Sequence, residues 1–318
     1  MMKKMWMKAA AVMITALALS GCSGASKPAE TTAAPAAAEA QSSEAQTTAA
    51  ESTDAESSAE GESTELDVNN LGPVLKKIYD RGSVIVGNDS SYPPFGFIDT
   101  TTNQAIGVEK EMATAIAAKL SEKLGKEIKL DFQSMEFSAV LSSLSTGKID
   151  LICSCLTVTD ERKKVMDFSD PYLQTQDVCL ILAKNKDQYQ SLDDFKDKKL
   201  AANTGSSQEV RANSISSTVT STPTVSDAIL QLQAGKVDAI VVDNITAERY
   251  SVGSDDLYSF ELSDDEVAPV DKAVGFQQGN EDLKAIINEV VKEQTEAGNV
   301  DSWVTEYAKK AAEMGLNK

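Results

Sequence analysis

The stretch LTVTDERKKVMDFSDPY, from Leu156 to Tyr172, constrains the fold of this chain more than any other. The apolar segment Ile149 to Ile152 precedes it and reads as a strand, and Thr159 is a good N-cap for a helix immediately after it. Arg162 then falls in the first turn of that helix, where the aligned peptide dipoles already make the helix end positive. The stretch therefore predicts a strand, a loop and a helix start that together concentrate positive potential.

Residues 1–21 have the pattern of a secretory signal peptide. Lysines precede an apolar, uncharged run from Ala9 to Leu19, which is too short to span a membrane comfortably. The run closes with LSGC, from Leu19 to Cys22, which resembles the lipobox of bacterial lipoproteins. This resemblance implies that Cys22 becomes the mature N-terminus and carries a diacylglyceryl group, whose two acyl chains hold a protein stably at a membrane. An ordinary secretory cleavage that leaves Cys22 unmodified is the alternative.

Residues 22–70 differ sharply in composition from the rest of the chain. From Ser23 to about Asp67 the sequence is mainly Ala, Ser, Thr, Gln and Glu, with no aromatic residue and with Lys27 as its single cation. Such a segment cannot bury enough apolar surface to offset its conformational entropy, so we predict a disordered tether behind the lipid anchor. The remaining chain, Leu71 to Lys318, is long enough for two compact units.

Composition argues against several classes of function. The net charge is −19, and the absence of a Lys or Arg cluster argues against nucleic-acid binding. No second apolar run of membrane length is present, so a transmembrane receptor is not expected. The chain contains no histidine, which removes Ser-His-Asp and Cys-His catalysis, HExxH zinc sites and every His-ligated metal. We therefore expect no catalytic residue, no metal and no cofactor.

Three cysteines follow Cys22. Cys153 and Cys155 lie two residues apart near the end of a strand and face the same side, which is a poor geometry for a disulfide between them. One of them could pair with Cys179 and leave the other free, while packed thiols are the simpler interpretation. Three cysteines without histidine also disfavour a metal site.

Strand and helix patterns alternate through the globular part, which predicts an α/β fold with a mostly parallel, helix-covered sheet. The predicted strands are Ser83–Val86, Lys126–Phe132, Ile149–Cys153, Cys179–Ala183, Lys199–Asn203, Ala239–Val242 and Ala273–Phe276. The predicted helices are Glu109–Leu124, Phe137–Thr146, one from Ser206, one near Ser226–Ala234 and two at the C-terminus. Polar segments at 184–187 and 263–266 interrupt the series, so we assign 71–184 and 271–318 to a first lobe and 185–270 to a second.

Polar residues gather where the predicted strands end. The first strand runs into GNDSSYPPF, Gly87 to Phe95, and the third into Cys153 to Thr157. A later strand runs into NTGSS, Asn203 to Ser207, and the strand Ala239 to Val242 delivers Asp243. Because ligands of open α/β sheets bind beyond the carboxyl ends of the strands, we expect a binding site at these ends.

Three sites at or shortly after these strand ends suit the charged ends of a small zwitterion. Arg162 can hold a carboxylate by a bidentate contact that a lysine could not reproduce. Free N–H groups around Ser206 and Ser207 offer a second anion-binding helix start, and Asp243 offers a counter-charge for an ammonium.

Each candidate also has a purely structural interpretation. The alternatives are a surface ion pair with a nearby aspartate for Arg162, helix caps for Ser206 and Asp243, and core packing for Tyr92 and Phe137. The convergence of all of these residues on strand ends favours the binding site.

Several motifs stand in a specific order along the chain. They are Gly87, Asp89 and YPPF at Tyr92–Phe95, then TGKID at Thr146–Asp150, TVTDER at Thr157–Arg162, DFSDPY at Asp167–Tyr172, and GKVDA at Gly235–Ala239 leading into Asp243. Together they resemble the amino-acid-binding proteins that serve bacterial ABC importers, solute-binding family 3 of the type II periplasmic-binding fold. The resemblance spans essentially residues 71–318. It implies two lobes that close like a hinge, with crossovers near 183–187 and 266–274.

The resemblance implies how the backbone groups of an amino acid would be bound. Arg162 would clamp the α-carboxylate, with help from Thr157 and from the backbone at Ser207. Asp243 would take the α-ammonium, with the carbonyl of Cys155 and the hydroxyl of Thr157 as further acceptors. Cys155 stands where the family often has a small residue or serine, which leaves its effect on specificity open.

The resemblance also implies how the ligand side chain would be held. Tyr92 and Phe137 would sandwich it, and Asp89 and Ser154 would face its tip. One departure from the family pattern is GVEKEM, from Gly107 to Met112, where the family usually has Gly-Phe-Asp-x-Asp-Leu. We expect this change to alter only a helix entry.

The sequence therefore predicts a lipid-anchored substrate-binding protein of an ABC importer, which captures a polar amino acid between two lobes and delivers it to a membrane permease and its ATPase. We expect a monomer on the outer face of the cytoplasmic membrane that performs no chemistry on its ligand. Two alternatives remain open. A dehydratase-like enzyme on the same fold would need a general acid, for which Asp89 is the candidate, and a sensor would dock on a signalling receptor instead of a permease.

Overall fold

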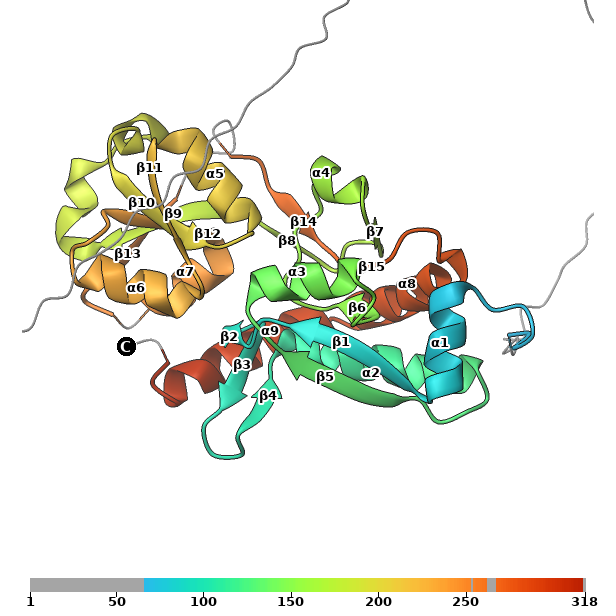
Figure 1. Cartoon of the computed structure of the whole chain (residues 1–318). Coiled ribbons are helices and arrows are strands. Elements are labelled where there is room, and N and C mark those ends of the chain that lie inside the picture. The colour runs from blue at the N-terminus through green and yellow to red at the C-terminus, as the bar shows by residue number, and fades with distance from the viewer. Residues whose placement is uncertain (1–65, 253, 262–266, 317–318) are drawn as a thin grey trace, which may run out of the picture. The chain divides into compact units, whose positions relative to one another are not determined.

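The computed structural model describes residues 66–252, 254–261 and 267–316, which form two lobes, each with its own five-stranded sheet (Figure 1). The predicted signal peptide, the predicted lipid site at Cys22 and most of the predicted tether lie outside the described residues, as does the polar break at 263–266. Within the described ranges, every helix is too short or too polar to span a bilayer.

The first lobe is built on a sheet with strand order β5-β1-β6-β15-β7. Strand β1 is parallel to β5 and β6, whereas β15 is antiparallel to β6 and β7. The strands of this lobe are β1 (Ser83–Asn88), β5 (Lys129–Ser134), β6 (Leu151–Ile152), β7 (Asp167–Phe168) and β15 (Gly275–Phe276), with β2 (Ser91–Tyr92), β3 (Gly96–Asp99) and β4 (Gln104–Ile106) in a small separate sheet. Its helices are α1 (Pro73–Arg81), α2 (Val108–Lys123), α3 (Phe137–Ser145), α4 (Asp160–Lys163), α8 (Glu281–Glu296) and α9 (Asn299–Glu313).

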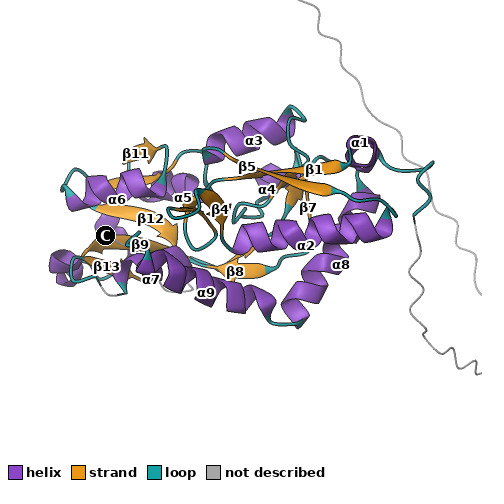
Figure 2. Ribbon diagram, turned by 90° about the horizontal axis from the view of Figure 1, so that it is seen from below, coloured by secondary structure: helices purple, strands orange, loops and turns teal. Residues whose placement is uncertain are grey.

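Helices cover both faces of the first sheet (Figure 2). Helices α2 and α8 pack on one face, where Met112, Ile116 and Val290 are buried, and α3 covers the other face with Val140 and Leu144. Residues four apart on a helix share one side, so Met112 and Ile116 form part of a continuous apolar stripe.

The second lobe has a sheet with strand order β11-β10-β12-β9-β13. Its strands are β9 (Asp177–Leu182), β10 (Lys199–Asn203), β11 (Thr218–Thr222), β12 (Ala239–Asp243) and β13 (Leu257–Phe260), and its helices are α5 (Ser207–Ile215), α6 (Val225–Gln233) and α7 (Asn244–Ser251), with 3₁₀ turns at Ala183–Gln188 and Leu192–Phe195. Ile240 and Val242 pack with residues of α6 and α7, whereas Ala239 and Val241 pack with residues of α5. Successive side chains of a strand point to opposite faces, which explains why β12 is apolar until it reaches Asp243.

Strands β8 (Leu173–Thr175) and β14 (Val270–Lys272) pair antiparallel and connect the two lobes (Figure 1). The predicted position of the first crossover, near 183–187, is wrong. Strand β9 pairs with β12 and β13 of the second sheet, so the chain leaves the first lobe before Asp177. The apolar sequence of β9 suits a central strand of either sheet, and the polar segment after it is a 3₁₀ turn within the second lobe. The second crossover, through β14, falls inside the predicted segment 266–274.

Candidate ligand-binding site

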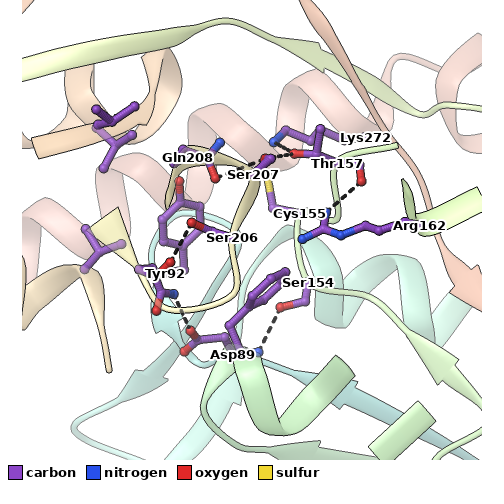
Figure 3. Close-up of a pocket in the computed structure, with 15 residues that line it drawn as sticks. Asp89, Tyr92, Ser154, Cys155, Thr157, Arg162, Ser206, Ser207, Gln208 and Lys272 are labelled. Atoms are coloured by element: carbon purple, nitrogen blue, oxygen red, sulfur yellow. Dashed lines mark hydrogen bonds between the residues drawn. The ribbon is translucent and has the colours of Figure 1, made fainter. Parts of the chain in front are cut away.

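A cavity of about 440 Å³, counting space open to solvent, lies where strand ends and helix starts of the two lobes meet (Figure 3). The residues predicted to bind ligand that line it are Asp89, Tyr92, Phe137, Ser154, Cys155, Thr157, Arg162 and Ser207. Its further lining residues are Asn203, Ser206, Gln208, Val225, Val241, Val242 and Lys272. Asp243 is the one predicted residue that does not line the cavity, although it contacts a residue that does.

Hydrogen bonds between the lobes involve the residues of this cavity. Ser207 Oγ of the second lobe donates to Thr157 Oγ1 of the first over 2.9 Å. Asn203 Nδ2 donates to Asp89 Oδ2 over 3.1 Å, and the Tyr92 hydroxyl donates to Asp243 Oδ2. The groups that line the cavity therefore also hold the two lobes together in this structure.

Arg162 supplies a partly buried positive charge to the cavity. Its Nη1 donates to the carbonyl of Thr157 over 2.7 Å, its Nη2 donates to the carbonyl of Gly205 over 3.2 Å, and the guanidinium carbon lies 5.5 Å from the centre of the Phe137 ring. Burial lowers the pKa of Arg162 to about 10, so the group is still protonated at neutral pH. A guanidinium has five N–H donors, and those not used by the two carbonyls can serve an anion.

The local structure around Arg162 follows the predicted pattern in part. Thr159 is the N-cap of α4, and its hydroxyl accepts a hydrogen bond from the Arg162 backbone N–H over 3.2 Å. Helix α4 is only four residues long, so the guanidinium itself rather than a helix dipole provides the positive potential. The alternative of a surface ion pair is not supported, because Asp160 pairs with Lys163 and Asp167 accepts from the backbone of Gly279.

The start of α5 faces the same end of the cavity. Ser206 is its N-cap and accepts from the backbone N–H of Glu209 over 3.0 Å, as predicted. The Glu209 carboxylate bonds the N–H of Gly205 instead of that of Ser206, so the reciprocal bond of a capping box is shifted by one residue. The first N–H groups of a helix have no partner within the helix. The N–H of Ser207 at this start can therefore serve an anion.

The opposite end of the cavity offers acceptors. Asp89 Oδ1 accepts from the N–H and the hydroxyl of Ser91 over 3.0 and 2.6 Å, and the Asp89 N–H donates to Ser154 Oγ over 2.9 Å. Burial raises the pKa of Asp89, and its hydrogen bonds with Ser91 and Asn203 act in the opposite direction. Asn203 Oδ1 is buried and has no hydrogen-bond partner among the described residues. These groups suit a ligand tip that carries N–H donors.

Both carboxylate oxygens of Asp243 accept hydrogen bonds from protein groups. Its Oδ1 accepts from the backbone N–H of Thr246 over 2.9 Å, which makes it the N-cap of α7, and its Oδ2 accepts from the Tyr92 hydroxyl. The capping role proposed as an alternative is thus present. Arg249, which is 5% exposed and stacks 3.6 Å from the centre of the Tyr250 ring, is also close enough for the Asp243 charge to favour its protonated form.

The buried side chain of Glu109 supports the wall of the cavity at Cys155. Cys155 has a φ of +47°, a left-handed conformation that disfavours residues with a side chain. Its N–H donates to Glu109 Oε1 over 2.8 Å, and the Tyr172 hydroxyl donates to the same oxygen over 2.6 Å. Burial raises the pKa of Glu109 to about 7. The prediction that the GVEKEM segment alters only a helix entry is therefore wrong, because Glu109 holds Cys155 in place.

The cysteines fit the packed-thiol interpretation. Cys153 and Cys155 are buried, and neither forms a disulfide with another cysteine in the part of the chain that the structure describes. Cys179 lies in β9, within the core of the second lobe. Among the residues that the structure describes, no group of three or more His, Cys, Asp or Glu side chains is placed to hold a metal ion.

Sequence reasoning missed several lining residues. Asn203 and Gln208 lie in or next to the NTGSS stretch, so their neighbourhood was identified but their side chains were not. Lys272, which is 1% exposed and donates to Thr157 Oγ1 over 2.7 Å, had no local motif. Its only sequence signal is a lysine within a run that is otherwise largely apolar, from Val270 to Phe276.

Two lobes, a paired crossover and a cavity lined by polar side chains from both lobes define a two-lobed ligand-binding protein. The family of bacterial extracellular solute-binding proteins, family 3, matches residues 84–310. The chain belongs to this family, and its fold is the type II periplasmic-binding fold.

Known relatives bind amino acids. The arginine-binding extracellular protein ArtP of Bacillus subtilis is 30% identical over 225 residues, which cover 70% of this chain and 84% of ArtP. The L-cystine-binding protein TcyJ of Escherichia coli is 29% identical over 231 residues, which cover 72% of this chain and 84% of TcyJ. Among solved structures, an amino acid ABC transporter substrate-binding protein, AbpA, from Streptococcus pneumoniae bound to L-arginine has a TM-score of 0.68 and 29% identity, and the match covers 74% of this chain and 98% of AbpA.

Proposed function

We propose that this chain is the substrate-binding component of an ABC importer, which captures a polar α-amino acid between its lobes and delivers it to a membrane permease with its ATPase. One observation carries the proposal. The partly buried guanidinium of Arg162 lines a cavity between the lobes and keeps unused N–H donors, and Asp89 with Asn203 offers acceptors at the other end.

The geometry is sufficient for useful affinity. Charge-assisted hydrogen bonds contribute about 1.5–3 kcal/mol each, and micromolar binding needs roughly 8 kcal/mol. A carboxylate at Arg162 and Ser207, an ammonium at Asp243 and one polar contact at Asp89 would reach that range. An ammonium at Asp243 would compete with the Tyr92 hydroxyl, which donates to Asp243 Oδ2.

The ligand tip is best matched by a side chain with N–H donors. Asp89 supplies a carboxylate and Asn203 Oδ1 supplies an acceptor without a partner. A guanidinium, an imidazole or an amide satisfies both, whereas a bare aliphatic tip would leave the Asn203 oxygen buried and unpaired at a cost of about 1–3 kcal/mol. Relatives that bind arginine and cystine are compatible with this class of ligand.

The membrane attachment is a further part of the proposal. Diacylation of Cys22 would anchor the chain to the outer face of the cytoplasmic membrane, and residues 22–70 would act as the tether to the two lobes. Fatty-acid labelling tests it, because Cys22→Ala removes the label and releases the protein from membranes. Labelling that survives this substitution contradicts the anchor.

Isothermal titration of the unfolded and refolded protein tests the amino-acid ligand. The refolding removes any ligand acquired during expression, and the panel is the twenty amino acids and L-cystine. We expect micromolar or tighter binding of one or a few polar members, and silence across the panel contradicts the proposal. Mass spectrometry of the recovered ligand separates binding from chemistry, because a dehydratase returns an altered molecule whereas a binding protein returns the amino acid unchanged.

A further inference from the structure

Arg249 is buried in the second lobe with its charge unpaired. It lies in the last turn of α7 and is 5% exposed. Its guanidinium nitrogens are buried, and none of them has a hydrogen-bond partner among the residues that the structure describes. The guanidinium carbon lies 3.6 Å from the centre of the Tyr250 ring instead. A buried charge is costly unless it is paired and hydrogen-bonded, so a partner for Arg249 is expected in another state of the protein.

Asp243 is the carboxylate that acts on Arg249. Burial lowers the pKa of Arg249, while Tyr250 and the charge of Asp243 oppose this effect. Asp243 is the N-cap of α7, and Arg249 follows it at a distance of about 9 Å along the helix axis. Side chains of a helix lean toward its start. A change of rotamer can therefore bring the Arg249 guanidinium to the carboxylate.

The first lobe occupies this carboxylate in the structure. Asp243 Oδ1 accepts from the N–H of Thr246 over 2.9 Å, and its Oδ2 accepts from the Tyr92 hydroxyl. Tyr92 belongs to β2 of the first lobe and packs against the core of the second lobe that contains Tyr250. Separation of the lobes removes Tyr92 from both contacts. Asp243 Oδ2 then needs a donor and Arg249 needs an acceptor, and both lie in the same lobe.

We propose that Arg249 is a positioning residue for ligand release, which pairs with the Asp243 carboxylate when the lobes separate and displaces the ligand ammonium from it. The proposal rests on the proposed function, because it assigns the α-ammonium of the ligand to Asp243. An ion pair that forms only in the open state shifts the equilibrium of the lobes toward opening. The charge of Arg249 also repels the ammonium, so both effects lower ligand affinity.

A purely structural role of Arg249 predicts different behaviour. A cation in the last turn of a helix interacts favourably with the helix dipole, and the guanidinium packs on Tyr250. If these were its only roles, loss of Arg249 would lower the free energy of unfolding and leave ligand release and lobe opening unchanged.

A double-mutant cycle separates the two roles. Arg249→Met removes the charge and keeps a long side chain, and Arg249→Lys keeps the charge. Asp243→Asn removes the charge of the acceptor, and the double variant completes the cycle. Arg81→Met is the matched control, because Arg81 pairs with Asp150 in the first lobe and neither residue lines the cavity.

Two readouts report the two parts of the role. Stopped-flow measurement of the dissociation rates of L-arginine, L-histidine and L-glutamine reports release. The distance between spin labels at Ser142→Cys on α3 and Ser214→Cys on α5, both exposed positions, reports lobe opening in the ligand-free protein. The labelled full-length proteins also carry Cys22→Ala, so that the native cysteines left are the three buried ones.

We expect Arg249→Met to slow dissociation about threefold to fivefold, the value of a partly exposed ion pair, and to raise affinity by the same factor. The labels of the ligand-free protein should shift toward the shorter distance of the closed lobes. Arg249→Lys should lie between this variant and the wild type. In the Asp243→Asn background the effect of Arg249→Met on dissociation should fall to about twofold or less, because Arg249 acts through that carboxylate. Arg81→Met should match the wild type in both readouts.

Unchanged dissociation and label distance in Arg249→Met, or equal effects in both backgrounds, overturn the proposal and leave Arg249 a structural role. If Arg249→Met does not fold, Arg249→Gln, which keeps donors and removes the charge, is judged by the same criteria. The label distance needs no ligand, so it also separates this proposal from the proposed function. A wild type that binds no member of the amino-acid panel contradicts the proposed function, whereas closure of the ligand-free lobes by Arg249→Met still supports the pair of Arg249 and Asp243.

Discussion

Arg162 of α4 in the first lobe lines the cavity and Asp243, which ends β12 in the second lobe, lies next to it, but their hydrogen bonds differ. Arg162 bonds two backbone carbonyls and keeps donors in reserve, whereas both carboxylate oxygens of Asp243 already accept from protein groups. In the proposed binding mode, the first lobe offers the ligand carboxylate a guanidinium that already has unused donors. The second lobe offers the ligand ammonium a carboxylate that already accepts from Tyr92, so the ligand competes with that hydroxyl.

This difference determines how much each lobe contributes to the free energy of ligand binding. A preformed group contributes its full interaction energy, while a group that must first give up a hydrogen bond contributes only the surplus. The Tyr92–Asp243 contact also joins the lobes, so a ligand that replaces it exchanges one bridge between lobes for another. Substitutions on the two sides should therefore have unequal and even opposite effects on affinity.

Removal of the Arg162 guanidinium is expected to have the largest effect. Arg162→Ala should weaken amino-acid binding by about 3–4 kcal/mol, several hundredfold, because a buried carboxylate then lacks its charged partner. Arg162→Lys should fall between that variant and the wild type, since it restores the charge without the planar fork. Titration with the best ligand of the panel measures both. Equal affinities for the alanine variant and the wild type would show that the anion site lies elsewhere.

Glu109 lies behind the first-lobe wall of the cavity, where it accepts a hydrogen bond from the N–H of Cys155. Burial raises its pKa to about 7, above the value of about 4.3 for an exposed glutamate. Between these values the folded protein binds more protons than the unfolded chain, so the contribution of Glu109 to stability falls as the pH rises through this window and levels off above it. Glu109→Gln stays neutral and keeps an acceptor for Cys155 and Tyr172.

Urea denaturation as a function of pH checks this expectation. The free energy of unfolding of the wild type, measured relative to Glu109→Gln, should decrease by on the order of 3 kcal/mol between about pH 4.5 and pH 8. Glu122→Gln serves as the control, because the Glu122 side chain is 55% exposed. A difference between the wild type and Glu109→Gln that does not vary with pH would mean that Glu109 titrates like a surface acid.

Asp243→Asn tests whether the carboxylate of the second lobe contributes to ligand binding. Asparagine still caps a helix, so the stability should change little, but the loss of the charge should weaken binding by about 2 kcal/mol, roughly thirtyfold. The contrast is Thr224→Ala, which removes the cap of α6 and should cost about 1 kcal/mol of stability without a change in affinity. Wild-type affinity of Asp243→Asn would exclude Asp243 from ligand binding.

Tyr92→Phe is expected to have the smallest effect on ligand affinity, and that effect is an increase. Without the hydroxyl, Asp243 Oδ2 loses its partner in the ligand-free protein, so the stability should fall by about 1 kcal/mol and ligand affinity should rise about fivefold. Tyr307→Phe removes a comparable hydroxyl contact, with Glu111, away from the cavity and should leave affinity unchanged. Weaker binding by Tyr92→Phe would mean that the hydroxyl contacts the ligand.

Local sequence patterns predicted helix starts and several residues of the binding cavity correctly. Thr159 and Ser206 were identified as helix starts and are N-caps in the structure. The rule that ligands bind beyond strand ends predicted a site that includes Asp89 and Arg162, and both residues line the cavity. Each of these inferences depends on residues close together in the chain.

Features that depend on distant partners were not predictable. Strand β9 is apolar on both faces, and only its pairing with β12 and β13 decides its lobe. The bond between Tyr92 and Asp243 joins residues 151 positions apart. The roles of Glu109 and Lys272 likewise appear only when α2 and β14 pack against the segment that carries Cys155 and Thr157.

Cys155 places a thiol in the wall of the binding cavity, and its surroundings determine its chemistry. Burial raises its pKa well above the ordinary value of a cysteine, and only the thiolate form reacts readily with oxidants and disulfides. Burial and a raised pKa therefore disfavour reaction of this thiol outside the cytoplasm, where disulfides form and persist. Redox conditions beyond the membrane would thus leave capture of the ligand unaffected.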